Sequence, residues 1–326
     1  MKILVTGGTG FVGSHLVEKL LTQDHSVVCL VRDQSKAERL FTREKPQFVV
    51  GDLDATDALS TAARGVEAVF HVAGLTAARS RADFHRVNVQ GTQTLVRIVA
   101  AKAKDVQRFV HVSSLAACGP TPDGVAANAS SKPQPVSQYG WSKLAGEEAV
   151  RRSDLPWVII RPPTVYGPRD TELFRIFKLA RTGLVPVLGT GEQSNSFVYI
   201  ADLVDALAAC LNAPEKATYF PSHPGIYTQR ELVHHVSRAL SEGATSARVI
   251  GVPELVARSS LWLTGTFARL LGRATLLNAD RANDFLASAW VCSSAELERD
   301  TGWRPETDLP NGLALTAQWY RQHGWL

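Results

Sequence analysis

The chain has 326 residues, of which 45% are hydrophobic and 20% charged, which is typical of a globular protein with one large or two smaller domains. A net charge of +4 is too small to indicate nucleic acid as a partner, and the four widely spaced cysteines form no metal-binding pattern. Because no apolar run approaches the ~18 residues that span a bilayer, we expect a cytoplasmic protein without a signal peptide or transmembrane segment.

Strand-like and helix-like segments alternate through the first half of the chain. The first apolar run, Ile3–Val5, leads into a glycine-rich turn and then into apolar residues at helical spacing as far as Leu21. Helical patterns such as Thr92–Ala103 separate most of the later runs. Those runs are Ser26–Val31, Gln47–Val50, Ala68–Val72, Phe109–Val112 and Trp157–Ile160. The alternation predicts an α/β fold whose parallel sheet is covered by helices on both faces.

The turn after the first strand carries Gly7, Gly10 and Gly13. Glycine permits positive φ angles and a close approach of backbone to a ligand, and the start of a helix attracts anions. In a strand–turn–helix context this spacing is typical of the pyrophosphate-binding turn of a Rossmann-type, doubly wound sheet. Taken alone, the motif leaves an ordinary glycine-rich turn open as an alternative.

A second pattern concerns Ser114, Tyr139 and Lys143. Tyr139 and Lys143 are four residues apart in a helical stretch, so they share one face of the helix. A nearby ammonium group lowers the pKa of a phenol from about 10, which lets a tyrosine exchange a proton with an alcohol or ketone near neutral pH. Ser114 follows a predicted strand and can hydrogen-bond the same substrate oxygen, with Ser113 as the alternative. The set indicates hydride transfer between an alcohol carbon and a nicotinamide.

These motifs resemble those of the extended short-chain dehydrogenases/reductases, over nearly the whole chain. The matching segments are Thr6–Gly13 (TGxxGxxG), Gly51–Leu53, His71–Gly74 (HxAG), Asn88–Thr92 (NVxGT), Tyr139–Lys143 (YxxxK), Arg161–Pro168 (RPxxVYGP) and Ser196–Leu203. The resemblance implies catalytic roles for Ser114, Tyr139 and Lys143. It implies cofactor contacts from Gly7, Thr9, Gly10, Phe11, Val12, Gly13, Arg32, Lys36, Asp52, Leu53, Val72, Ala73, Gly74, Thr76, Asn88, Tyr139, Lys143, Pro162 and Thr164.

Two departures from the nucleotide-sugar branch of that family narrow the expected reaction. Dehydratases carry a carboxylate pair where this chain has Leu115 and Ala116, and nucleotide-sugar enzymes place an arginine where it has Asn195. The sequence therefore resembles dihydroflavonol reductases and hydroxysteroid dehydrogenases more closely. We expect a dehydrogenase or reductase of a hydrophobic small molecule. A nucleotide-sugar epimerase that retains NAD is the alternative, and a non-catalytic dinucleotide-binding protein is a third reading, against which the Ser–Tyr–Lys set argues.

The domain prediction also follows the resemblance. We expect a dinucleotide-binding domain at 1–165 to which 192–228 returns, and a smaller, largely helical substrate domain at 166–191 and 229–326. The resemblance also implies a homodimer. Leu255–Leu277 is apolar with three interspersed arginines, which fits a packed helix, a lid or a helix that contacts a membrane surface. Gly119–Val136 is a long loop, either a functional lid or a surface excursion.

Cofactor choice depends on the end of the second strand. NAD-using relatives carry an acidic residue at the position of Val31, where it hydrogen-bonds the ribose 2′-hydroxyl. Arg32 follows and Lys36 lies nearby, so their charges favour the 2′-phosphate of NADP(H). Asp33 either reaches the ribose, which would keep NAD(H) open, or caps the next turn. We also expect His71 to be a hydrogen-bonded strand residue, and Asn88 to be either a helix-start residue or a ribose contact.

Overall fold

The computed structural model describes residues 1–122, 124–240 and 247–326. Its main feature is a seven-stranded sheet in the order β10-β6-β5-β4-β1-β2-β3, in which every neighbouring pair is parallel. The strands are β1 (Lys2–Thr6), β2 (Ser26–Val31), β3 (Gln47–Val50), β4 (Ala68–His71), β5 (Arg108–Val112), β6 (Trp157–Ile160) and β10 (Ala217–Tyr219). The order reverses between β1 and β4, and such a switch point is where ligands of open parallel sheets bind.

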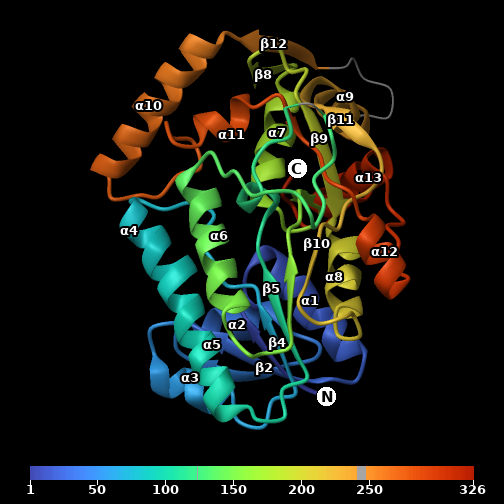
Figure 1. Ribbon diagram of the computed structural model, residues 1–326. Coiled ribbons are helices and arrows are strands. Elements are labelled where there is room, and N and C mark those ends of the chain that lie inside the picture. The colour runs from blue at the N-terminus through green and yellow to red at the C-terminus, as the bar shows by residue number, and fades with distance from the viewer. Residues whose placement is uncertain (123, 241–246) are drawn as a thin grey trace.

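Helices cover both faces of this sheet, as Figure 1 shows. One face carries α1 (Phe11–Thr22) and α8 (Ile200–Ala209), and the other carries α3 (Thr56–Ala62), α5 (Gly91–Lys102) and α6 (Gln138–Arg151). In β1, Ile3 and Val5 belong to the core that includes α1, whereas Leu4 belongs to the opposite core. Burial on both faces is why the strands are almost continuously apolar. The α/β fold class predicted from the sequence is confirmed.

The rest of the chain lies above the carboxyl ends of the sheet in Figure 1. A four-stranded sheet joins β9 (Ser194–Tyr199) to β7 (Thr164–Tyr166), β11 (Ile226–Thr228) and β13 (Ala289–Trp290), and a pair joins β8 (Leu184–Leu188) to β12 (Arg248–Val252). The helices here are α7 (Thr171–Arg181), α9 (Gln229–Leu240), α10 (Glu254–Leu270), α11 (Ala282–Leu286), α12 (Ala295–Thr301) and α13 (Leu309–Gln322). Short elements complete the described chain: α2 (Gln34–Leu40), α4 (Arg81–Phe84), a π-helix (His85–Gln90) and a 3-10 turn (Leu115–Ala117).

Two long segments differ from a simple reading of the sequence. The helix expected within Leu255–Leu277 ends at Leu270, and Gly272 then takes a φ of +66°. The described parts of the loop Gly119–Val136 are tied to the strand β13 region, since Ala127 bridges to Cys292 and the Thr121 N–H donates to the Ala289 carbonyl. The described part of that loop is therefore held against the β13 region; Asp123 is not among the described residues. Among the described residues no helix is long and apolar enough to cross a membrane.

Candidate active site

The glycine turn between β1 and α1 fits a dinucleotide pyrophosphate. Gly7 has a φ of +74°, and a Cβ atom there would lie 2.6 Å from the Ala73 nitrogen. A Cβ on Gly13 would lie 2.2 Å from the Gly7 carbonyl oxygen, so neither position tolerates a side chain. Helix α1 starts at Phe11 with no acidic residue in its first turn, and its first N–H groups have no acceptors within the helix. The turn thus presents unpaired donors at a helix start, which suits an anion.

The other predicted cofactor residues lie mainly at the same edge of the sheet. Val72, Ala73 and Gly74 directly follow β4, and the Ala73 N–H donates to the Thr6 hydroxyl at 3.3 Å. Asp52 and Leu53 follow β3; the Asp52 carboxylate accepts two backbone N–H groups of its own turn, at 3.0 and 3.1 Å. Thr76 and Pro162 also follow strand ends, Thr164 opens β7, and Thr76 and Thr164 are exposed. Thr9 lies in the glycine turn, and Phe11 and Val12 open α1.

The end of β2 shows how the two candidates for cofactor selection are placed. Arg32 directly follows the strand and is exposed, as is Lys36. The Asp33 side chain accepts the Lys36 backbone N–H at 2.9 Å and so caps α2. Of the two roles that the sequence leaves open for Asp33, the structure shows the cap.

Asn88 does not take the helix-start position, which is one of the two roles expected for it. It lies inside the π-helix, not at a helix start, and is buried. Its side-chain oxygen accepts the Leu75 N–H at 2.7 Å, and its amide donates to the Leu75 carbonyl at 3.0 Å and to the Ser142 hydroxyl at 2.9 Å. Asn88 therefore holds the loop after β4 against α6. The ribose contact stays a prediction.

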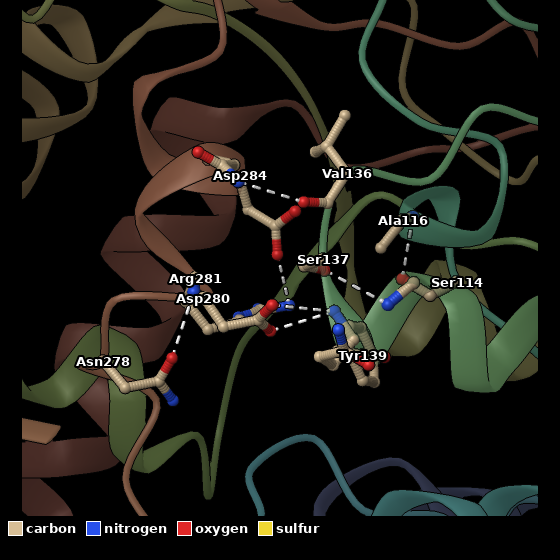
Figure 2. Close-up of polar contacts among 12 residues, drawn as sticks. Ser114, Ala116, Val136, Ser137, Tyr139, Asn278, Asp280, Arg281 and Asp284 are labelled. Atoms are coloured by element: carbon tan, nitrogen blue, oxygen red, sulfur yellow. Dashed lines mark hydrogen bonds and ion pairs between the residues drawn. The ribbon is translucent and has the colours of Figure 1, made fainter. Parts of the chain in front are cut away.

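The structure brings Ser114, Tyr139 and Lys143 together. Ser114 follows β5 and lies beside the Tyr139 phenol, and its hydroxyl accepts the Ala116 N–H at 3.1 Å. Lys143 lies one turn after Tyr139 on α6, and its ammonium donates to the Val112 carbonyl at 2.7 Å. A Cβ on Gly74 would lie 3.4 Å from the Lys143 Nζ, so the ammonium also borders the loop after β4. Ser114 and Tyr139 appear in Figure 2.

Burial sets the protonation of this group. It raises the pKa of Tyr139, against the hydrogen bond from Ser114 and the charge of Arg281, which both lower it. Burial lowers the pKa of Lys143 to about 8, against the opposing effect of the Glu147 carboxylate. The sequence predicts a lowered phenol pKa; here the shift is upward, because desolvation of the phenolate outweighs the nearby cations. Tyr139 accordingly keeps its proton at neutral pH.

A buried ion pair supports the site from behind and is absent from the sequence-based prediction. Glu147 is completely buried, and its carboxylate accepts two N–H groups of Arg161, at 2.9 and 2.7 Å. The Ser113 hydroxyl also donates to Glu147, at 2.5 Å. Ser113, the alternative to Ser114, is therefore already engaged away from Tyr139. The missed signal is the spacing of Tyr139, Lys143 and Glu147, which lie four residues apart on one helix face.

A second group reaches Tyr139 from the start of α11, as Figure 2 shows. The Arg281 guanidinium lies 4.7 Å from the centre of the Tyr139 ring and pairs with Asp284 at 2.6 Å. The Asp280 carboxylate accepts the Gln138 N–H at 2.9 and 3.1 Å, next to the tyrosine. Sequence reasoning gives no sign that Arg281, Asp280 or Asp284 lies next to Tyr139.

His71 behaves as the sequence predicts. It is completely buried at the end of β4 and hydrogen-bonds the Thr6 hydroxyl at 2.7 Å and the Thr92 hydroxyl at 2.9 Å. Burial lowers its pKa to about 3, so it is neutral over the physiological range. It links β1, β4 and α5 beneath the glycine turn.

Comparisons with known proteins agree with this architecture. The chain is 32% identical over 327 residues to a ceramide reductase of Caulobacter vibrioides, covering 99% of this chain and 96% of the relative. It is 29% identical over 342 residues to a UDP-glucose 4-epimerase of Mycolicibacterium smegmatis, covering 98% and 99%. Its fold is similar to that of a UDP-glucuronic acid 4-epimerase from Bacillus cereus, solved with UDP-glucuronic acid and NAD, with a TM-score of 0.80, 22% identity and coverage of 99% and 100%.

Reductases and epimerases thus both occur among the relatives, so the comparisons support an enzyme family without fixing the reaction. The family model that matches describes the NAD dependent epimerase/dehydratase family and covers residues 3–220. With its seven-stranded parallel sheet and its glycine turn, the chain belongs to this family, within the extended short-chain dehydrogenases/reductases.

Proposed function

We propose that the protein reduces a ketone on a hydrophobic small molecule to an alcohol, with NADPH as the reductant. The observation that carries the proposal is the burial of Tyr139 beside Ser114 and Lys143, which raises the pKa of the phenol and keeps it protonated. A neutral phenol is the form that donates a proton to a carbonyl oxygen. The alternative, deprotonation of an alcohol, needs the phenolate that burial disfavours here.

In this reaction the side chains divide the work. A bound NADPH supplies the hydride that reduces the carbonyl carbon. Tyr139 donates the phenolic proton to the carbonyl oxygen, and Ser114 holds that same oxygen by a hydrogen bond. Lys143 binds beside the nicotinamide ribose and keeps a positive charge near the phenolate that the proton transfer leaves behind. Arg281, above the Tyr139 ring, adds a second cation that favours the phenolate.

Two features favour a reductase over an epimerase of nucleotide sugars. The Asn195 side chain donates to the Gln193 carbonyl at 2.7 Å, so the position that carries a phosphate-binding arginine in nucleotide-sugar enzymes holds a neutral, internally bonded amide. Arg281, an arginine at the site that could otherwise bind a phosphate, is already paired with Asp284 at 2.6 Å. The 32% identity to a ceramide reductase further supports a hydrophobic substrate, since a ceramide is a lipid.

The epimerase remains the second candidate. It is supported by the likeness to a UDP-glucose 4-epimerase over 98% of the chain. An epimerase oxidises and reduces the same carbon, so it holds its dinucleotide through the cycle and shows no net consumption of NADPH.

For the cofactor we propose a preference for NADP(H). Arg32 is exposed at the end of β2, where a guanidinium can bind a 2′-phosphate, and Asp33 is engaged as the cap of α2. In Arg32→Ala we expect at least about a tenfold loss of NADPH affinity, or 1.4 kcal/mol, and little change for NADH. Titration of both cofactors by calorimetry measures this. Equal affinities of the wild type for NADPH and NADH would contradict the preference.

The domain division is part of the same proposal. We assign 1–165 and the returning segment 192–228 to the cofactor domain, and 166–191 and 229–326 to the substrate domain. Its support is that β10, within the returning segment, pairs with β6, and that α8 packs on α1. The site then lies between the end of β5, helix α6 and the α11 segment.

The decisive experiment compares wild type and Tyr139→Phe on two substrates. Wild type should oxidise NADPH in the presence of a hydrophobic ketone, and Tyr139→Phe should reduce turnover by several orders of magnitude with cofactor affinity unchanged. UDP-glucose serves as the second substrate, with product sugars separated by chromatography. Conversion of UDP-glucose without net NADPH loss would favour the epimerase instead. Turnover of Tyr139→Phe close to wild type would remove Tyr139 as the proton donor.

A further inference from the structure

Helix α10 lies at the rim of the molecule (Figure 1), and most of its large apolar residues are exposed. Leu255, Phe267 and Leu270 are 78%, 65% and 80% exposed. Other large apolar residues of this segment are also exposed, namely Val256, Trp262, Leu263, Leu271 and Leu277. A surface helix of a globular protein normally turns such residues toward the core. An apolar surface of this extent marks an interaction site.

The contact of α10 with the rest of the protein uses small residues. Its buried positions are Ala257, Leu261 and Gly265, which recur every four residues and so form one narrow stripe. A Cβ on Gly265 would lie 2.7 Å from the Cβ of Asn278, so the helix lies directly against that segment. The exposed apolar residues occupy the opposite side of the helix, so the fold of this chain does not use them.

The charged residues within Leu255–Leu277 are all arginines. Between Leu255 and Leu277 the sequence contains three arginines, Arg258, Arg269 and Arg273, and no aspartate or glutamate. Arg258 pairs with Glu254 at the start of the helix at 2.8 Å. Arginines beside an exposed apolar helix face complement anionic lipid headgroups, which attract basic side chains while the apolar residues enter the acyl boundary.

An apolar groove lies beside this surface. It has a volume of about 530 Å³ and lies between α10 and the start of α11. Its lining residues are Arg258, Ser259, Trp262, Leu263, Ala279 and Ala282. Ala279 and Ala282 lie on either side of Arg281, whose guanidinium stacks on Tyr139. One short segment of chain therefore separates the groove from the tyrosine.

We propose that α10 docks the protein on the surface of an anionic lipid bilayer, with the helix in the plane of the interface. At 17 residues the helix lies on a membrane and does not cross it. Docking presents the groove beside Trp262 and Leu263 to the acyl region, so that an apolar substrate enters from the bilayer. The docking surface stands independently of the reaction, whereas its use for substrate uptake depends on the reductase proposed above.

The direct test is vesicle binding without catalysis. Wild type should sediment with vesicles of phosphatidylglycerol and phosphatidylcholine, and much less with phosphatidylcholine alone. The variant Leu255→Glu/Phe267→Glu/Leu270→Glu changes exposed residues that do not line the groove, and should lose at least about a hundredfold in partition coefficient, because it removes apolar contact and adds like charge. The matched control Ile226→Glu/Ile250→Glu/Leu315→Glu changes exposed apolar residues outside α10 and should bind as wild type does.

The arginines are tested separately. Arg269→Gln/Arg273→Gln should weaken binding to the anionic vesicles at least about tenfold. The control Arg64→Gln/Arg304→Gln removes the same charge from other elements and should have little effect. Equal losses in both pairs would mean that net charge alone drives the binding, and would overturn docking by α10. Docking by α10 would also be overturned if the wild type did not bind anionic vesicles. A third refuting result would be self-association through α10, seen by light scattering, that persists when vesicles are present.

Substrate uptake has its own readout. In the glutamate variant, reduction of a long-chain aliphatic ketone carried in anionic vesicles should fall at least tenfold, while reduction of a short ketone dissolved in buffer stays unchanged. Equal activity on the vesicle-borne ketone would refute delivery from the membrane. If wild type binds vesicles but reduces neither ketone, the reductase proposal fails and the docking surface stands.

Discussion

The buried carboxylate of Glu147 gives the sharpest test of how the site is held together. Its partner Arg161 is 2% exposed and donates two hydrogen bonds to it, at 2.9 and 2.7 Å. Glu147→Gln keeps the side-chain shape but leaves Arg161 as a buried charge without its counter-ion. Breaking a buried pair in this way costs about 3–5 kcal/mol. We expect a loss of that size in the free energy of unfolding, measured by urea denaturation at pH 7.

The neighbouring residue provides a matched control. Glu148, also on α6, pairs with Arg152 at 3.3 Å, but both of these side chains are largely exposed. Exposed pairs contribute about 0.2–1 kcal/mol, so Glu148→Gln should be close to neutral. The double variant Glu147→Gln/Arg161→Met removes both charges and should recover much of the lost stability. Equal losses in Glu147→Gln and Glu148→Gln, or no recovery in the double variant, would refute the buried-charge explanation.

Glu147 also acts on the catalytic group that we propose. Its charge raises the pKa of Lys143, which burial otherwise lowers to about 8. In Glu147→Gln the Lys143 pKa should therefore fall further, and the basic limb of the pH–rate profile should move to lower pH. A purely structural role of Glu147 would reduce the amount of active protein and leave the profile in place.

Three further variants test the surrounding structure. Lys143→Met should stabilise the protein by up to about 3 kcal/mol at pH 7, because the lysine pKa falls from 10.5 unfolded to about 8 folded. Between these two values the unfolded state binds more protons than the folded state, so the free energy of unfolding of the wild type rises from pH 8 toward pH 10. The stability advantage of Lys143→Met should therefore shrink over that range, and an advantage that stays constant in urea denaturation would contradict this. Gly13→Ala should destabilise by about 1–3 kcal/mol, because its Cβ meets the Gly7 carbonyl at 2.2 Å, whereas Gly10→Ala meets one atom at 3.2 Å and should cost less in thermal unfolding. Asp202→Ala should cost about 1–3 kcal/mol, because it leaves the Glu306 and Thr307 N–H groups unpaired, and Asp205→Ala, which removes an exposed pair with Lys19, should not; chemical denaturation that ranks the two aspartates equally would refute it.

The sheet could be predicted because its strands carry their own signal. The runs at Ser26–Val31, Gln47–Val50 and Trp157–Ile160 have the same bounds as β2, β3 and β6. Burial on both faces makes β6 and nearly all of β2 apolar, and β3, at the edge of the sheet, still carries the apolar run Phe48–Val50. Strand β10 was not predicted. It has only three residues, Ala217–Tyr219, and it is a strand because it pairs with β6, a contact that no local pattern encodes.

The site divides in the same way. Ser114 follows one strand, and Tyr139 and Lys143 lie four residues apart on one helix. Both positions can be inferred from short local patterns, so these three residues could be assigned to one site from the sequence. Arg281 reaches the tyrosine from 142 residues further along the chain, and only the folded structure shows that it stacks on the ring and pairs with Asp284. The end of α10 was likewise missed. The apolar pattern of the sequence continues past Gly272, whereas the helix ends at Leu270 and Gly272 takes a positive φ.

Burial shifts the pKa values of Tyr139 and Lys143, both on α6, in opposite directions. These shifts bear on the direction of the proposed reaction. The Tyr139 pKa rises while that of Lys143 falls to about 8, so as pH increases the lysine loses its proton before the tyrosine does. The phenol is therefore a stable proton reservoir for ketone reduction. The phenolate formed by donation is correspondingly basic, and it is stabilised by the Ser114 hydroxyl and the Arg281 charge. Reprotonation from solvent or from Lys143 is then downhill, so the site resets itself for another reduction, and the reverse oxidation should require alkaline pH.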